Sequence, residues 1–179
     1  HAGFRLDPNF KSLGKQFKKI KIIGKKKALD NFIRQTKKIS KFAQKNKVNI
    51  LIENNVVTKK NLDKFKSNPF LLTNYNDVKK FFKLMPKNVR LLVDVAHLKV
   101  SAKTEKLDPI RSLKIMNKYV EGYHFSENNG LMDSNKPFKK NAWFLPYIKK
   151  NLNYYSIEVY NASTNKLKNQ INILKKQLK

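Results

Sequence analysis

Short runs of aliphatic and aromatic residues, each followed by one acidic residue or histidine, recur along this chain at nearly even intervals. The runs are Val48–Ile52, Arg90–Val93, Tyr119–Tyr123 and Tyr154–Ile157, and they end at Glu53, Asp94, His124 and Glu158. These end residues are 41, 30 and 34 residues apart. Apolar runs that are each followed by a helical segment are typical of parallel strands joined by crossover helices. The sequence therefore predicts an α/β fold with a parallel sheet.

Helix signals occur between these runs. Apolar side chains recur on one helical face in the first and the last of the helical segments, and asparagine, aspartate and proline stand where helices begin and end. Asn74 or Asn76 can cap one helix, which Pro86 ends, and Asp108 followed by Pro109 opens another. The predicted helices span residues 29–47, 74–85, 109–117 and 161–178.

The intervals between the strands fit the βα units of a TIM (β/α)8 barrel, which average about 30 residues. We expect the C-terminal part of such a barrel, about four to five βα units with outer helices, as a single partial domain over residues 1–179. The chain begins with His1 rather than Met, and the first residues look like the end of an earlier strand. We therefore expect an N-terminal truncation. Open sheet edges aggregate unless they are covered, so a partner that completes the sheet is the alternative, and a homo-oligomer is left open.

The composition excludes several protein classes. The chain has no cysteine, which rules out a disulfide scaffold and a cysteine zinc site. No apolar run approaches the ~20 residues of a membrane helix, and we expect a cytoplasmic protein without a membrane partner. The net charge of +28 suits a polyanion surface, because basic residues release phosphate counterions. However, only 4 of the 40 basic residues are arginine, and abundant Lys, Asn, Ile and Phe are typical of an A+T-rich genome. We favour genome bias and keep nucleic-acid binding as an alternative.

Acidic residues and histidines share one position in the predicted fold. Glu53, Asp94 and Glu158 each end an apolar run. The histidines of the chain lie at or just beyond predicted strand ends: His1, His97 and His124. The carboxyl ends of parallel barrel strands meet at one face, and buried carboxylates without partners are costly. A shared divalent cation solves this, and Mn, Co, Mg or Zn accepts mixed carboxylate and imidazole ligands. The alternative is that each acid pairs with one of the many lysines.

Several motifs resemble the xylose isomerase-like TIM barrels, a superfamily that includes sugar phosphate isomerases and epimerases and the endonuclease IV type of apurinic-site nuclease. The motifs run from His1 to about residue 160: His1-Ala2-Gly3, Ile52-Glu53-Asn54, Asp94-Val95-Ala96-His97, the segment 124–130 with Asp133 shortly after, and Ile157-Glu158. The resemblance implies that one divalent ion is bound by Glu53, Asp94, His124 and Glu158. It also implies that His97 faces the substrate or a second metal.

Such a site predicts isomerisation or epimerisation of a sugar or sugar phosphate, because a divalent cation stabilises the ene-diolate formed when a carbon acid loses its proton. We assign the proton transfers to Glu53 and Glu158, and the orientation or protonation of an oxygen to His97. The expected substrate-binding residues are His1, Asn128, Asp133 and Trp143. Asn128 is also explained as part of a polar turn, and Trp143 as core packing.

Two departures from the family pattern bear on this choice. Endonuclease IV-like members carry a histidine two residues after the aspartate of the long loop, where this chain has Asn135. An amide oxygen is a poor zinc ligand. Epimerases often place an arginine in the loop beyond the strand-end histidine, and residues 127–130 here read Glu-Asn-Asn-Gly. We favour a sugar isomerase or epimerase, and keep as alternatives an apurinic-site nuclease and a non-catalytic basic module that binds polyanions.

Overall fold

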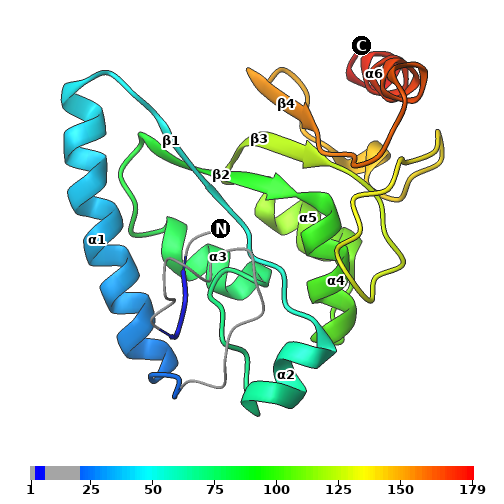
Figure 1. The fold of residues 1–179 in the computed structure, drawn as a ribbon. Coiled ribbons are helices and arrows are strands. Elements are labelled where there is room, and N and C mark those ends of the chain that lie inside the picture. Colours follow the sequence, from blue (N-terminus) through cyan, green and yellow to red (C-terminus); the bar gives the residue numbers. More distant parts are fainter. Residues whose placement is uncertain (1–2, 7–20) are drawn as a thin grey trace.

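The computed structural model describes residues 3–6 and 21–179 (Figure 1). Within this part of the chain, four strands form one sheet in the order β1-β2-β3-β4, and every neighbouring pair is parallel. The strands are β1 (Ile50–Glu53), β2 (Val89–Asp94), β3 (Val120–Phe125) and β4 (Tyr154–Ile157). The predicted α/β class is confirmed, and the predicted strand bounds agree with the observed ones to within two residues.

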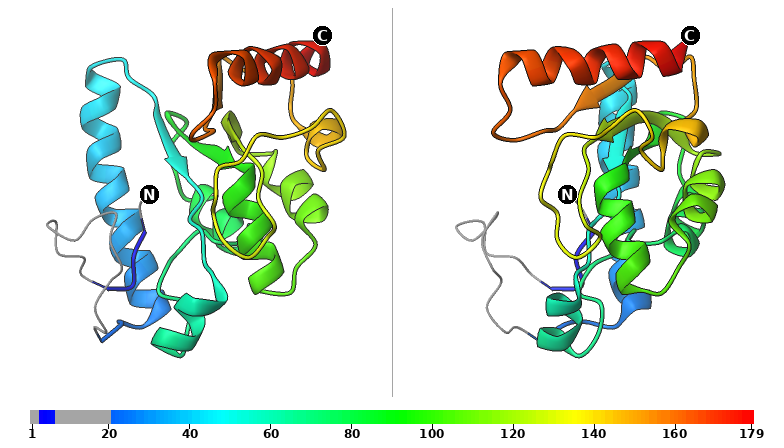
Figure 2. Two further views of the ribbon diagram at one scale, coloured as in Figure 1. Left: turned by 45° about the vertical axis from the view of Figure 1, so that its right-hand side comes forward. Right: turned by 90° about the vertical axis from the view of Figure 1, so that its right-hand side faces the viewer.

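Helices cover one face of this sheet (Figures 1 and 2). The helices are α1 (Lys25–Lys45), α2 (Lys59–Phe65), α3 (Tyr75–Phe82), α4 (Val95–Thr104), α5 (Pro109–Met116) and α6 (Thr164–Leu178), with a 3₁₀ turn η2 (Leu145–Tyr147). Helices α3 and α4 contact the sheet, and α5 packs on these two helices. Helix α6 lies across β4. None of the described helices is long and apolar enough to cross a lipid bilayer.

The predicted helices correspond to α1, α3, α5 and α6, and the predicted caps Asn74 and Asp108 each accept a backbone hydrogen bond at a helix start. Helices α2 and α4 were not predicted. Helix α4 is buried on nearly all sides, so its sequence shows no single apolar face. Helix α2 buries no residue, and its signal is the capping box formed by Thr58 and Asn61.

The connection from β3 to β4 departs from the predicted alternation. Residues 126–153 hold no α-helix, only η2, so the expectation that every strand is followed by a helix is wrong here. Aromatic packing stabilises this segment instead. The rings of Phe138 and Phe144 lie 6.3 and 5.5 Å from Phe125 of β3, and 5.4 Å from each other. The loop is therefore anchored to the sheet by buried rings.

The sequence predicts that the large apolar side chains of the first helix share one face. For α1 this prediction is wrong in part. Ile39 and Phe42 are 60% and 71% exposed, whereas the small residues Ala28, Ser40 and Ala43 are buried. Phe32 follows the prediction, because its ring stacks on Phe81 of α3 at 4.7 Å. Helix α1 therefore packs mainly through small residues and leaves two large apolar side chains exposed.

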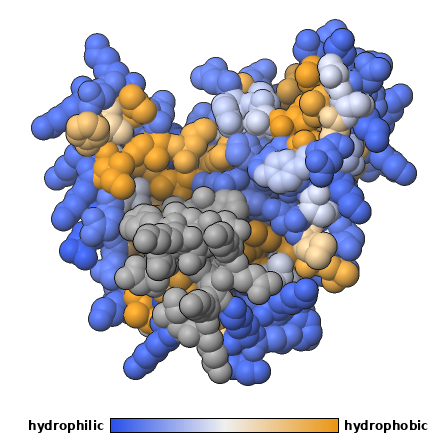
Figure 3. Space-filling view, viewed as in Figure 1, coloured by the Kyte–Doolittle hydropathy of each residue, from blue (hydrophilic) through white to orange (hydrophobic). Residues whose placement is uncertain are grey.

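Both edges of the sheet carry apolar surface. Strands β1 and β4 each have a single strand neighbour among the described residues. Figure 3 shows hydrophobic surface beside β1 and α1 and again beside β4 and α6. An apolar groove of about 410 Å³, lined by Ile157, Ile171 and Leu174 among others, lies between β4 and α6. The two edges are thus more apolar than an ordinary solvated surface.

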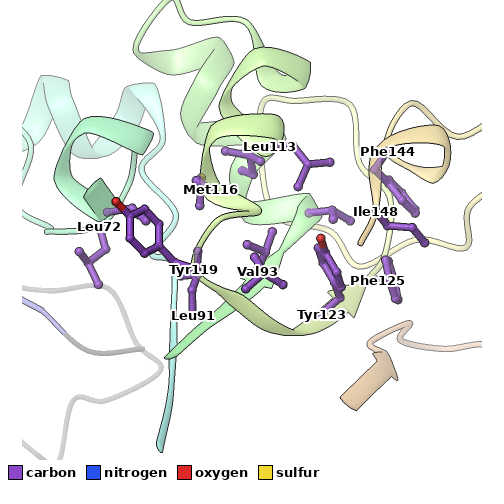
Figure 4. Close-up of a cluster of buried hydrophobic side chains, with 14 of the residues drawn as sticks. Leu72, Leu91, Val93, Leu113, Met116, Tyr119, Tyr123, Phe125, Phe144 and Ile148 are labelled. Carbon is purple, nitrogen blue, oxygen red and sulfur yellow. The ribbon is translucent and has the colours of Figure 1, made fainter. Parts of the chain in front are cut away.

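The core lies between the sheet and helices α4 and α5 (Figure 4). Its fully buried members include Leu91, Val93, Leu113 and Met116. Strand β2 is an inner strand of the sheet, and nearly all of its residues are buried.

We expect Leu91→Ala to lower the free energy of unfolding by about 2–5 kcal/mol, since removal of the buried side chain leaves a cavity.

Urea unfolding followed by circular dichroism measures this loss, with Leu84→Ala as the matched control. Leu84 is 53% exposed, so its truncation is expected to change stability by no more than about 0.5 kcal/mol. Equal losses in the two variants would contradict the placement of β2 in the core.

Candidate metal centre

Four side chains converge at the carboxyl ends of the four strands. Glu53 and Asp94 are the last residues of β1 and β2, His124 lies near the end of β3, and Glu158 directly follows β4. One ligand atom from each lies within 4.8 Å of those of the other three. Parallel strands place their carboxyl ends at one edge, so residues 105 positions apart in the sequence meet here. The cluster can hold a metal ion.

His124 lies between the two glutamates. Its Nδ1 is 3.0 Å from Glu53 Oε1 and 3.0 Å from Glu158 Oε2. The hydrogen bond with Glu53 raises the pKa of His124, and the charges of Glu53, Glu158 and Asp94 add to this against the effect of burial. Burial alone would raise the pKa of Glu53, but the His124 hydrogen bond and the nearby histidine charges outweigh it and lower that pKa. Glu53 is therefore held as a carboxylate.

Asp94 is the buried member of the cluster. Its Oδ1 accepts a 2.8 Å bond from the backbone N–H of His97 and so caps α4. Its Oδ2 is buried and has no hydrogen-bond partner among the described residues. Burial, together with the charges of Asp133 and Glu53, raises the pKa of Asp94 to about 6 against the lowering effect of His97. An unsatisfied buried carboxylate oxygen is costly, and a cation beside Glu53, His124 and Glu158 would satisfy it.

The alternative to a shared cation is that each acidic residue pairs with a lysine. This alternative fits the acids outside the cluster better than those inside it. Asp77 and Glu127 pair with Lys25 and Lys99 at 2.8 and 2.7 Å. In the described part of the chain, no lysine or arginine forms an ion pair with Asp94 or Glu158. Despite 36 lysines in the sequence, these two acids face histidines and each other. The residues present therefore fit a bound cation.

His97 lies behind the cluster and is 2% exposed. Its Nδ1 is 2.9 Å from the carbonyl oxygen of Asn54, and its Nε2 is 3.1 Å from Asp133 Oδ2. The ring also lies 4.0 Å from Glu53 and 3.9 Å from Asp94. Burial lowers the pKa of His97, but the Asp133 hydrogen bond and the surrounding carboxylates raise it to about 9. His97 is thus a protonated, buried side chain at neutral pH.

The residues predicted to bind substrate fall in different places. Asp133 contacts His97 at the edge of the cluster. Asn128 is buried, donates to the Ala96 carbonyl oxygen and accepts from Gly130 N–H, which fits the turn alternative. Trp143 packs edge-to-face on Phe144 at 5.8 Å and against the core, which fits the packing alternative. His1 lies outside the described residues.

Asn135, at the departure from the nuclease pattern, is buried at 3% exposure with a φ of 43°. Its backbone carbonyl accepts a hydrogen bond from Tyr160 N–H. Its side-chain Oδ1 has no partner among the described residues. Asparagine tolerates this left-handed conformation better than most residues, so backbone geometry is one reason for an asparagine here.

Three residues around the cluster had no predicted role. Asn54 is fully buried, accepts from Asp94 N–H at 2.8 Å and donates to the Asp94 carbonyl oxygen at 3.1 Å. Tyr160 donates to Glu158 at 2.9 Å, and that bond is the main reason its pKa is raised. Tyr154 lies beside His124. The period of two along a strand places Tyr154 on the same face as Glu158. Asn54 stands in the Ile52-Glu53-Asn54 motif, which gave it no role, and nothing in the sequence singles out Tyr160.

The fold and cluster together define an α/β protein that resembles about half of a TIM barrel, with a site for a cation at the carboxyl ends of its strands. The structure is similar to a candidate xylose isomerase from Rhodospirillum rubrum, with a TM-score of 0.60 and 13% identity over 86% of this chain and 54% of that chain. It is also similar to D-psicose 3-epimerase from Clostridium cellulolyticum, solved with D-tagatose, with a TM-score of 0.53 and 13% identity over 88% of this chain and 55% of that chain.

The chain thus spans about half the length of both structures. At this identity the similarity concerns the fold, and it confirms the predicted resemblance to xylose isomerase-like TIM barrels. No family model and no curated protein sequence matches the chain.

We expect Asn54→Ala to lower the free energy of unfolding by about 1–3 kcal/mol, because the N–H and carbonyl groups of Asp94 would both lose a buried partner. Urea unfolding measures the change. Asn172→Ala is the control, because Asn172 is exposed on α6 and has no comparable role. If Asn54→Ala is as stable as Asn172→Ala, Asn54 does not hold the end of β2.

Proposed function

We propose that this protein is a sugar isomerase or epimerase that depends on one divalent cation. The observation that carries the proposal is the convergence of Glu53, Asp94, His124 and Glu158 within 4.8 Å. The names of the two similar structures, a candidate xylose isomerase and a D-psicose 3-epimerase, support the same chemistry. The substrate class is a free or phosphorylated sugar with a carbonyl next to a hydroxyl-bearing carbon.

Glu53, Asp94, His124 and Glu158 would hold the cation. Three carboxylates and one imidazole form a mixed oxygen and nitrogen donor set, which suits Mn, Co, Mg or Zn. When bound, a divalent cation supplies electrostatic stabilisation for the negative charge that develops on the substrate oxygens.

Glu53 and Glu158 are the groups proposed to move protons. Their strands β1 and β4 form opposite edges of the sheet, so the two carboxylates approach the space above His124 from opposite sides. One carboxylate takes a proton from the substrate carbon and the other returns a proton. Return to the opposite face of the same carbon gives an epimer, and return to the neighbouring carbon gives an isomer.

His97 is proposed to hold a proton close to a substrate oxygen. It is buried and protonated, and Asp133 fixes its ring at Nε2. A charge that is already fixed and desolvated needs little reorganisation during the reaction, which is what favours electrostatic stabilisation. In this proposal Asp133 and the Asn54 carbonyl oxygen fix the orientation of the His97 ring beside the cluster.

We expect Glu158→Gln to abolish turnover and to weaken metal binding by more than about tenfold, because the amide has no negative charge and no basic oxygen. Isothermal titration with Mn²⁺ and a sugar epimerisation assay measure the two effects. Glu121→Gln is the matched control, because Glu121 is 40% exposed and its contact is with Arg90. Full activity in Glu158→Gln, or equal losses in both variants, would overturn the assigned role.

Metal content and salt dependence separate this proposal from its alternatives. We expect about one bound ion per chain and only weak nonspecific association with DNA. An apurinic-site nuclease would hold three ions, and a non-catalytic basic module would hold none. Both alternatives would bind DNA tightly, with a steep fall in affinity as salt rises. Elemental analysis and DNA titrations at two salt concentrations make these measurements, and either tight DNA binding that persists at physiological salt or a different metal count would contradict the sugar enzyme.

A further inference from the structure

Tyr154 of β4 lies over Gly122 of β3, which has no side chain. In the sheet register Tyr154 is opposite Gly122 of β3, and His124 is two residues further along β3 on the same face. A Cβ added at Gly122 would lie 2.8 Å from Tyr154 Cδ1, closer than real Cβ contacts. Glycine at this position is therefore what allows the tyrosine ring to cross β3 and approach His124.

The two nitrogens of His124 have separate partners. Nδ1 faces the carboxylates of Glu53 and Glu158 at 3.0 Å. Nε2 lies 3.4 Å from the hydroxyl oxygen of Tyr154, and the two rings are 6.0 Å apart. Metal-binding histidines usually donate their other ring N–H to a fixed acceptor, which sets both the orientation of the ring and the position of its proton.

We propose that Tyr154 is a positioning residue for His124. Its hydroxyl oxygen accepts a hydrogen bond from Nε2–H, which turns the ring so that Nδ1 points at the cluster. On metal binding, Nδ1 would release the proton that it shares with the carboxylates and offer its lone pair to the cation. This inference rests on the proposed metal site and deepens it. Tyr154 acts through His124 and has no proton-transfer role of its own.

The exposure of Tyr154 makes this proposal testable without loss of the fold. Its side chain is 44% exposed, so removal of the hydroxyl opens no buried cavity. Tyr123 differs in this respect. Its hydroxyl donates to Asn117 and accepts from Lys149 N–H, and burial raises the pKa of Tyr123 to about 12.

The first measurement is Mn²⁺ affinity by isothermal titration of the metal-free full chain. We expect Tyr154→Phe to bind Mn²⁺ about tenfold or more weakly than the wild type, with an unchanged thermal unfolding midpoint. Tyr147→Phe is the matched control, because Tyr147 lies on η2 against Lys114 and away from the cluster. Its affinity is expected to equal that of the wild type.

The second measurement does not need the metal. The ¹⁵N resonance of His124 Nε2 in the metal-free protein is expected to shift in Tyr154→Phe, while the His97 ring resonances stay unchanged. Gly122→Ala tests the contact between Tyr154 and His124 in a second way. The added methyl group displaces the tyrosine ring but leaves its hydroxyl in place on the ring. It is expected to shift the same His124 resonance.

The outcomes separate the two proposals. If the wild type binds no Mn²⁺, the proposed function fails, and the His124 resonance alone decides the role of Tyr154. If the wild type binds Mn²⁺ and Tyr154→Phe binds it equally well, the positioning role is overturned. An unchanged His124 Nε2 resonance in Tyr154→Phe also overturns it, whatever the affinity.

Discussion

Electrostatic repulsion among three carboxylates is the constraint on which this structure depends. Glu53, Asp94 and Glu158 come within 4.8 Å of one another, and at such distances like charges in a partly buried site repel by several kcal/mol at an effective dielectric constant near 20. His124 lies between the two glutamates and His97 lies behind them, so two imidazoles offset part of the repulsion. The pKa of Asp94 is raised to about 6, mainly by burial and further by the charges of Asp133 and Glu53, against the lowering effect of His97. A divalent cation would supply positive charge at this point.

The backbone holds these charges together. Asp94 is the last residue of β2 and at the same time the capping residue of α4, so its carboxylate cannot move without loss of the capping bond from His97 N–H. Asn54 binds both backbone groups of Asp94 from the neighbouring strand, which joins the ends of β1 and β2. His97 is in the first turn of α4 and binds back to the Asn54 carbonyl oxygen. The cluster is therefore built into the carboxyl ends of the strands and is not a group of independent surface side chains.

The sequence predicted the strands and the four converging residues because both depend on local pattern and on one topological rule. Apolar runs mark buried strands, and parallel strands end at the same edge. What could not be predicted depends on tertiary context. Helix α4 is buried on nearly all sides, Asn54 acts through its side chain on a residue 40 positions away in the neighbouring strand, and the loop after β3 is held by packed rings rather than by a helix. None of these leaves a periodic signal in the sequence.

The cluster carries negative charge, whereas the chain as a whole carries positive charge. The net charge of +28 raises the local concentration of anions around the molecule, yet the carboxylates of the cluster repel an anion that approaches the site itself. A divalent cation in the cluster would offset most of this negative charge, and the same cation would satisfy the buried oxygen of Asp94. A phosphorylated sugar would gain from the surface lysines, whereas the reacting end of any sugar would depend on the cluster. In the proposed enzyme, surface charge and site charge would thus act on different parts of the substrate, and the abundance of lysine by itself does not argue for a nucleic-acid ligand.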